Sequence, residues 1–273
     1  MKITILVDNH AGEGLIAEHG LSLWIEVEGR HILFDTGQGR ALEPNARALG
    51  VDLGKTDYLV LSHGHYDHTG GISTVLRLAR SVDIYCHPGA VQPRHSLRDG
   101  IARPIQMPDE SLAAVDALPA HRLHWVQRPM LLFEGVGVSG PIPRETSYES
   151  MSGPFYLDPE GKREDRHDDE IALWIRTSRG VVVCTGCCHA GLVNTLNHVY
   201  RLNGGMRIRA AIGGFHLLDA DRSRLDKTTA ALLLIDPDAV IPCHCTGDAA
   251  TAALERALGD RVSPGAGGAA YRF

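Results

Sequence analysis

Three histidines and an aspartate fall within six positions in the segment Leu61-Ser-His63-Gly-His65-Tyr-Asp67-His68. On an extended stretch alternate side chains point the same way, so His63 and His65 can bind one ion together. Asp67 and His68 lie where the chain turns into a helix, and they can reach a second ion. Imidazole and carboxylate suit zinc, iron or manganese, with water at the remaining positions. The segment therefore predicts a two-metal site, and the alternative is a polar loop with coincidental histidines.

This spacing resembles the metallo-β-lactamase superfamily, whose signature is His-x-His-x-Asp-His after a strand. The turn Phe34-Asp35-Thr36-Gly37 is similar to a second landmark of that superfamily. The resemblance implies that Asp35 lies behind the metals, where it orients a metal-bound histidine without being a ligand itself. The alternative for Asp35 is an ordinary turn or helix-cap aspartate.

Further ligands are expected after three later strands. In the segment Gly-Cys187-Cys-His189, Cys187 falls where the superfamily presents the residue between its metals, and His189 can project to the same side. His244, between two cysteines, matches the last histidine of the superfamily pattern. His216, at another strand end, could be a ligand, a proton-transfer group or a core histidine, and we expect it to act in catalysis without binding metal. A structural role is the alternative for each, and buried cysteines often serve as small hydrophobes.

One departure from the superfamily concerns the middle of the chain. Many of its hydrolases carry a further metal-binding histidine in a Gly-His segment, and His189 is expected to replace it here. The histidines of the middle region lack that context: His87, His95, His121, His124 and His167. Five of the six cysteines cluster in the two segments that carry His189 and His244, which favours metal or redox chemistry over disulfides.

The combination of Gly-Cys-Cys-His, Gly-Gly-Phe-His and His-Cys-Thr-Gly resembles one branch of the superfamily. That branch is named for 7,8-dihydropterin-6-yl-methyl-4-(β-D-ribofuranosyl)aminobenzene 5′-phosphate synthase. The resemblance covers nearly the whole chain, including Asp8-Asn9 and Asp168-Asp169-Glu170.

The elements that must position these residues alternate in the first and last thirds of the chain. Strands are expected at 3–7, 23–27, 31–34, 58–61, 171–176, 181–184, 208–212 and 239–242, and helices at 39–49, 72–79, 192–202, 224–235 and 249–258. Strand-rich halves with flanking helices predict an α/β protein with a four-layer αββα sandwich, and the resemblance implies the metallo-β-lactamase type. We expect one domain over 1–273, with an insertion or lid at about 86–170 and an edge hairpin near 131–138.

Composition narrows the function classes. The chain has 273 residues, of which 44% are hydrophobic and 22% charged, so an ordinary globular core is expected. A net charge of -6 does not indicate nucleic-acid binding. Because the sequence has neither a membrane span nor a signal peptide, we expect a cytoplasmic protein without a membrane partner. A small-molecule substrate is expected, and a homodimer is common among such folds.

The two-metal site favours hydrolysis. Two divalent ions about 3.5–4 Å apart can generate hydroxide at neutral pH and polarise a carbonyl or phosphoryl group. The sequence therefore predicts a hydrolase of a small phosphoester, lactone or thioester, with Asp67 as a ligand that also contacts the nucleophilic water. Zinc is the expected metal, with iron or manganese as alternatives.

Two other functions stay open. The branch resemblance implies a transferase that joins a dihydropterin pyrophosphate to a ribofuranosylaminobenzene phosphate, with loss of pyrophosphate. Four arginines of the middle region could then bind phosphate, unless they are ordinary surface charges: Arg94, Arg98, Arg103 and Arg144. The third class is a non-enzymatic metal-binding or redox-sensing protein that uses the cysteine-rich segments.

Overall fold

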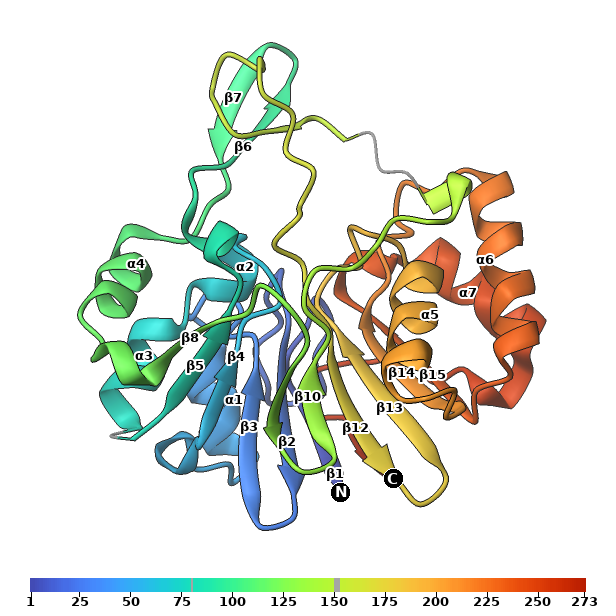
Figure 1. Ribbon diagram of the computed structural model, residues 1–273, viewed down its shortest axis with the longest axis horizontal. Coiled ribbons are helices and arrows are strands. Elements are labelled where there is room, and N and C mark those ends of the chain that lie inside the picture. The colour runs from blue at the N-terminus through green and yellow to red at the C-terminus, as the bar shows by residue number, and fades with distance from the viewer. Residues whose placement is uncertain (80, 150–152) are drawn as a thin grey trace.

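Two mixed sheets face each other, and helices cover the outer face of each (Figure 1). The protein is seen here as a computed structural model, which describes residues 1–79, 81–149 and 153–273. The predicted four-layer αββα sandwich is therefore confirmed.

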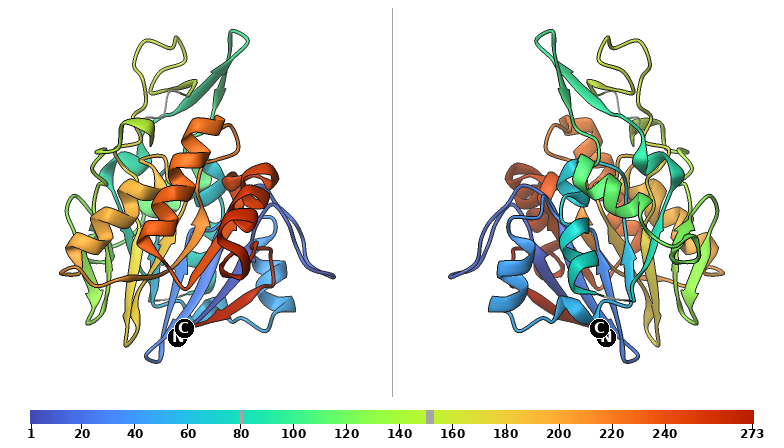
Figure 2. Two further views of the ribbon diagram at one scale, coloured as in Figure 1. Left: turned by 90° about the vertical axis from the view of Figure 1, so that its right-hand side faces the viewer. Right: turned by 90° about the vertical axis from the view of Figure 1, so that its left-hand side faces the viewer.

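The first sheet has seven strands in the order β16-β1-β2-β3-β4-β5-β8. Its strands are β1 (Lys2–Val7), β2 (Ser22–Val27), β3 (Arg30–Phe34), β4 (Tyr58–Val60), β5 (Asp83–Cys86), β8 (Leu123–Trp125) and β16 (Ala270–Arg272). The helices against its outer face are α1 (Leu42–Ala48), α3 (Ile72–Leu78) and α4 (Asp109–Asp116). The sequence did not predict β16, which pairs with β1 and brings the two chain ends together (Figure 2).

The second sheet has six strands in the order β15-β14-β13-β12-β10-β9. Its strands are β9 (Met130–Phe133), β10 (Val136–Val138), β12 (Leu173–Thr177), β13 (Gly180–Thr185), β14 (Ile208–Gly214) and β15 (Ala239–Cys243). The helices packed on it are α5 (Leu192–Leu202), α6 (Arg222–Ile235) and α7 (Asp248–Leu258). All three helices lie within one or two residues of their predicted bounds.

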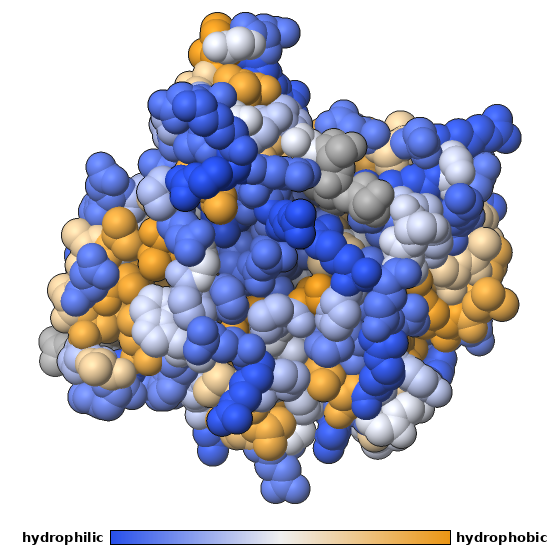
Figure 3. All heavy atoms as spheres, turned by 45° about the horizontal axis from the view of Figure 1, so that its top comes forward, coloured by the Kyte–Doolittle hydropathy of each residue, from blue (hydrophilic) through white to orange (hydrophobic). Residues whose placement is uncertain are grey.

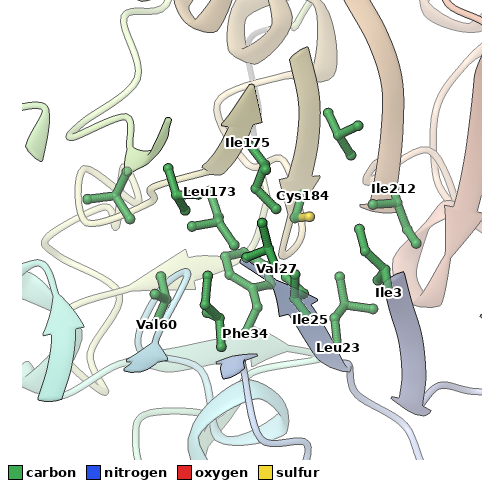
Figure 4. Packing of buried hydrophobic residues seen from close by; sticks show 14 of the residues in the cluster. Ile3, Leu23, Ile25, Val27, Phe34, Val60, Leu173, Ile175, Cys184 and Ile212 are labelled. Atoms are coloured by element: carbon green, nitrogen blue, oxygen red, sulfur yellow. The ribbon is translucent and has the colours of Figure 1, made fainter. Parts of the chain in front are cut away.

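The core between the sheets follows from alternation along the strands. Leu23 and Ile25 of β2 point inward, and they share a buried cluster with Leu173 and Ile175 of β12 (Figure 4). Trp24, between the first two, points outward to the helices of the first sheet. Successive side chains of a strand face opposite sides of a sheet, so alternation along β2 predicts which of its side chains face the core.

A small third sheet projects from the sandwich above the other elements in Figure 1. Its strands are β6 (His95–Arg98), β7 (Ile101–Pro104) and β11 (Phe155–Tyr156). The predicted insertion at 86–170 is thus too wide, because β8 belongs to the first sheet and the β9–β10 hairpin forms an edge of the second. The hairpin expected near 131–138 is present as β9–β10, whereas weak periodicity hid the short strands β6, β7, β8 and β11. Residues 150–152 of that range lie outside the described chain.

α1 begins three residues later than the helix predicted from residue 39. The backbone at Gly39 has a φ of +100°, and a Cβ there would lie 2.9 Å from the carbonyl oxygen of Gly70. Gly50 follows the helix with a φ of +69°, which is the backbone conformation expected of a glycine after a helix. Across the described ranges, we find no helix with the length and hydropathy needed to cross a membrane.

Candidate metal centre

The predicted ligands meet at one edge of the sandwich, where strands of both sheets end. β4 leads into His63, and the short helix α2 (Tyr66–Thr69) carries Asp67 and His68. In the second sheet β13, β14 and β15 run parallel, with Thr185 opposite Gly213. Parallel strands end at the same edge of a sheet. Their ends therefore bring four predicted residues to this place: Cys187, His189, His216 and His244.

The first group of donors is formed by His63, His65 and His189, which are all buried. Nε2 of His63 lies 3.0 Å from Nδ1 of His65, and the donor atoms of His63, Cys187 and His189 all lie within 4.8 Å of one another. Nε2 of His65 and both ring nitrogens of His189 have no hydrogen-bond partner among the described residues. Buried polar atoms are rarely left without a partner, so this group fits a metal ion.

The second group is formed by Asp67, His68 and His244. Oδ2 of Asp67 lies 3.4 Å from Nε2 of His244 and 3.9 Å from Nε2 of His68. Sγ of Cys187 lies 3.2 Å from the same His68 nitrogen. Cys187 therefore stands within reach of both groups, as was predicted for the residue between the metals.

Asp35 is fully buried behind both groups. Its Oδ2 accepts a hydrogen bond from Nδ1 of His68 at 2.7 Å, which turns Nε2 of that ring toward Asp67. The Ser62 hydroxyl donates to Asp35 at 2.7 Å and lies 2.8 Å from Nδ1 of His63. This geometry suits the predicted orienting role, because a carboxylate behind a ligating imidazole fixes its ring.

Two carboxylates and one amide also hold the later ligands in place. Nδ1 of His244 lies 2.9 Å from Oδ1 of Asn9, and its backbone N–H donates to Asp8 at 2.8 Å. The backbone N–H of His189 donates to Glu170 at 2.6 Å. Asp8-Asn9 and Glu170 belong to the segments that carried the branch resemblance, so those segments act as supports of the centre.

Protonation differs between the two groups. Burial holds the pKa of His63 and His189 well below the usual range and lowers the pKa of His65 to about 3. These imidazoles are therefore neutral and able to bind an ion. Burial also lowers the pKa of His68, but Asp35 and Asp67 outweigh it and raise that pKa to about 9. In the second group the carboxylates thus favour a protonated imidazole, whereas burial keeps the imidazoles of the first group neutral.

Backbone strain gathers at the centre. Eight non-glycine residues have a positive φ in the described chain, and five of them lie at the centre: Asp35, His167, Cys188, His216 and His244. Such conformations cost about 1–3 kcal/mol each and persist where the surrounding structure enforces them. The fold therefore enforces an unfavourable backbone conformation at these five positions, and this conformation sets the direction of side chains at the centre.

Three residues of the centre were not predicted as part of it. The buried ring of His167 stacks on His189 with ring centroids 3.9 Å apart; its one sequence signal was its place just before Asp168-Asp169-Glu170. Nε2 of His19 lies 3.1 Å from Oδ2 of Asp67, and no motif marks His19. Cys245 has donor atoms of Cys187 and His216 within 4.8 Å.

A pocket of about 690 Å³ reaches both groups. Its lining includes His65, Asp67, Cys187, His189 and His244, together with the predicted catalytic residue His216. In Figure 3 the face below the projecting sheet is hollowed and mostly hydrophilic. The pocket thus gives a small molecule access to the centre.

The arginines expected to bind phosphate mostly lie elsewhere. Arg94 is 2% exposed and pairs with Asp165 and Asp169 at 2.9 and 2.7 Å, so it is a structural ion pair. Arg144 donates to the carbonyl of His189 at 2.8 Å, and Arg103 is exposed on β7. Of the four, only Arg98 lines the pocket. A sequence shows the charges of arginines but not their partners.

Comparison with known proteins identifies the family. The profile of the metallo-β-lactamase superfamily matches residues 16–197. The chain is 30% identical to the 7,8-dihydropterin-6-methyl-4-(β-D-ribofuranosyl)-aminobenzene-5′-phosphate synthase of Methanocaldococcus jannaschii, over 90% of this chain and 88% of that one. It is 32% identical to an uncharacterised protein of the same organism, over 90% of each chain.

A solved structure extends the likeness to the whole fold. Tm1679, a metal-dependent hydrolase of the β-lactamase superfamily, is 28% identical, with a TM-score of 0.84 over 100% of this chain and 99% of that one. The chain therefore belongs to the metallo-β-lactamase superfamily. It combines that fold with buried groups of histidine, cysteine and aspartate that are consistent with metal binding.

Proposed function

We propose that this chain is a binuclear metal-dependent hydrolase of a small phosphoester, lactone or thioester. The observation that carries the proposal is the place of Cys187, whose Sγ lies within 4.8 Å of donor atoms in both histidine groups. Two-metal hydrolases need two ions close together beside an open pocket. A donor shared by two groups, in the lining of such a pocket, supplies that arrangement.

We assign seven side chains to the two ions: His63, His65 and His189 to the first, Asp67, His68 and His244 to the second, and Cys187 to both. Imidazole, thiolate and carboxylate together suit zinc, with iron or manganese as the other candidates. Two such ions would supply Lewis acidity and make water easier to deprotonate at neutral pH.

The side chains at the pocket would then direct the reaction. Asp67 lines the pocket, and its carboxylate would accept a hydrogen bond from the attacking water and orient it. His216 lines the same pocket, with its ring centroid 4.6 Å from that of His189. It would transfer a proton to the leaving group, because a histidine at such a site can act as a general acid.

A transferase is the second candidate, favoured by the synthase relative with 30% identity over 90% of this chain. Its reaction would join a dihydropterin pyrophosphate to a ribofuranosylaminobenzene phosphate and release pyrophosphate. Because no water is consumed, pyrophosphate released only in the presence of both substrates would separate this function from hydrolysis.

The first experiment measures metal content of the purified chain by inductively coupled plasma mass spectrometry. We expect two ions of zinc, iron or manganese per chain, and fewer in His63→Ala. The same preparations are then given phosphoesters, lactones and thioesters. Asp67→Asn with metal retained should lose turnover, and full activity in that variant would contradict the proposed role of Asp67. Less than half an ion per chain after reconstitution would contradict the two-metal centre.

A further inference from the structure

One wall of the pocket comes from the start of α6 and from the turn η4 (Ser147–Glu149). Ser223, Arg224 and Lys227 of α6 line the pocket, and so does Tyr148 of η4. Side chains three and four positions apart share one face of a helix, so Ser223, Arg224 and Lys227 are neighbours there. This wall therefore presents two cations and two hydroxyl groups to one space.

Lys227 forms no ion pair within the described part of the chain. Its Nζ lies 5.5 Å from the centre of the Tyr148 ring, a contact that positions an ammonium group without neutralising it. Arg222 differs, since it pairs with Asp226 at 3.6 Å and does not line the pocket. The charge of Lys227 is thus available to a bound molecule.

The two carboxylates of the same wall, Asp219 and Asp221, do not pair with Lys227 among the described residues. Oδ1 of Asp221 accepts a hydrogen bond from the backbone N–H of Arg224 at 2.7 Å, so it caps the helix. Asp219 also lines the pocket, and no ion pair joins it to Lys227 among the described residues.

We propose that this wall binds a phosphate group at the end of the substrate that lies away from the metals. The assignment rests on the proposed function, because the other end of the molecule would react at the centre. The Lys227 ammonium and the hydroxyls of Ser223 and Tyr148 line one space and match the three terminal oxygens of a phosphate monoester. Lys227 thus takes the phosphate-binding part that was expected of Arg94, Arg103 and Arg144.

The test is equilibrium binding to the metal-loaded full chain by isothermal titration calorimetry. The probes are α,ω-alkanediol bisphosphates from propane to octane and the alkyl monophosphates of the same lengths, each as its phosphonate analogue, in which a P–C bond that water does not cleave replaces the ester bond. The single phosphate of a monophosphate can bind at the metals, and so can one phosphate of a bisphosphate. The difference in affinity between the two probes therefore reports binding of the second phosphate at the wall. We expect the best-fitting bisphosphate to bind about tenfold more tightly than its monophosphate, as one charge-assisted contact predicts.

Lys227→Met keeps the side-chain stem and should remove most of that gain, with monophosphate affinity unchanged. Lys227→Arg should restore it. Lys162→Met is the matched control, because Lys162 is exposed and does not line the pocket. A gain that survives Lys227→Met, or no gain at any length, would overturn the proposal. An equal gain from ω-carboxyalkyl phosphates would overturn the assignment to phosphate.

Because binding is measured without turnover, the two proposals fail separately. A chain that hydrolyses none of the test substrates but shows the Lys227-dependent gain contradicts the hydrolase and supports the phosphate wall. A chain that hydrolyses a phosphoester without the gain contradicts the wall and supports the hydrolase.

Discussion

The two halves of the candidate metal centre are held in different ways. In the second half, the rings of His68 and His244 are each anchored through their Nδ1 atoms. Asp35 accepts from His68 at 2.7 Å, and Asn9 contacts His244 at 2.9 Å. Each Nε2 atom is thereby aimed at Asp67.

The first half is anchored mainly through its backbone. The N–H of Gly64, between the two histidines of the motif, donates to Asp169 at 2.8 Å, and the N–H of His189 donates to Glu170 at 2.6 Å. Nε2 of His65 and both nitrogens of the His189 ring have no hydrogen-bond partner in the described ranges.

This difference in anchoring indicates which half is preorganised for its ion. A ring fixed through its second nitrogen is oriented before an ion arrives, whereas a ring fixed only at its backbone can still rotate about its side-chain bonds. We infer that the second half is preorganised and that an ion completes the first. Substitutions at each set of anchors should therefore affect the two halves unequally.

The largest effect is expected from Arg94→Met. Arg94 neutralises Asp165 and Asp169 in a buried ion pair, and Asp169 also holds Gly64. A buried pair that loses one partner destabilises a protein by about 3–5 kcal/mol. We expect that loss in the free energy of unfolding, measured by urea denaturation, together with loss of the first-half ion.

The control for Arg94→Met is Arg163→Met, which removes an exposed arginine from its pair with Asp158. That variant should unfold at the same urea concentration as the parent chain. An Arg94→Met protein with unchanged stability and two bound ions would show that the backbone anchors do not hold the first half.

Asp35→Asn should act mainly on the second half. The backbone at Asp35 has a φ of +59°, which asparagine adopts more readily than alanine, so the variant removes charge with little added strain. Loss of a carboxylate behind a ligating histidine lowers metal affinity about 10–100-fold. Chelator competition should show one weakened site, with a smaller effect on the first half through Ser62.

Asp99→Asn is the matched control for Asp35→Asn, since Asp99 also has a positive φ, of +53°, but is exposed and away from the pocket lining. It should bind metal as the parent does. Two ions held with parental affinity in Asp35→Asn would refute preorganisation by this carboxylate.

The sequence predicted best what depends on neighbours along the chain. Alternation in the strand 23–27 identified its inward face, and the helix at 192–202 was placed with its observed bounds. The spacing of the motif from His63 to His68 located the centre for the same reason, because one short segment from the end of β4 through α2 carries all four side chains.

Contacts between distant residues could not be predicted in this way. His167 reaches His189 because two loops of the fold meet, and its positive φ of +51° leaves no mark in the sequence. Arg94 pairs with Asp165, which is 71 residues away in the sequence. The sequence does not show this partner, so the arginine was expected to bind phosphate although its charge is already paired. The branch resemblance did point to the supporting acids, although not to what each one holds.

The smallest effect is expected from Asn9→Ala, which tests whether a neutral anchor matters as much as a charged one. The variant removes the contact to Nδ1 of His244, a longer bond to the carbonyl oxygen of that residue and one from the backbone N–H of Gly20. It leaves Asp8 bound to the backbone N–H of His244, and only the contact to Nδ1 orients the ring. One neutral hydrogen bond contributes about 0.5–1.5 kcal/mol, so the second-half ion should bind several-fold more weakly. Chelator competition measures this, with Asn203→Ala as control because it removes side-chain hydrogen bonds to Val199 and Arg176 instead. If the second-half ion loses as much affinity as in Asp35→Asn, ring orientation rather than charge governs this half. If its affinity is unchanged, the Asp35 carboxylate is the anchor that governs it.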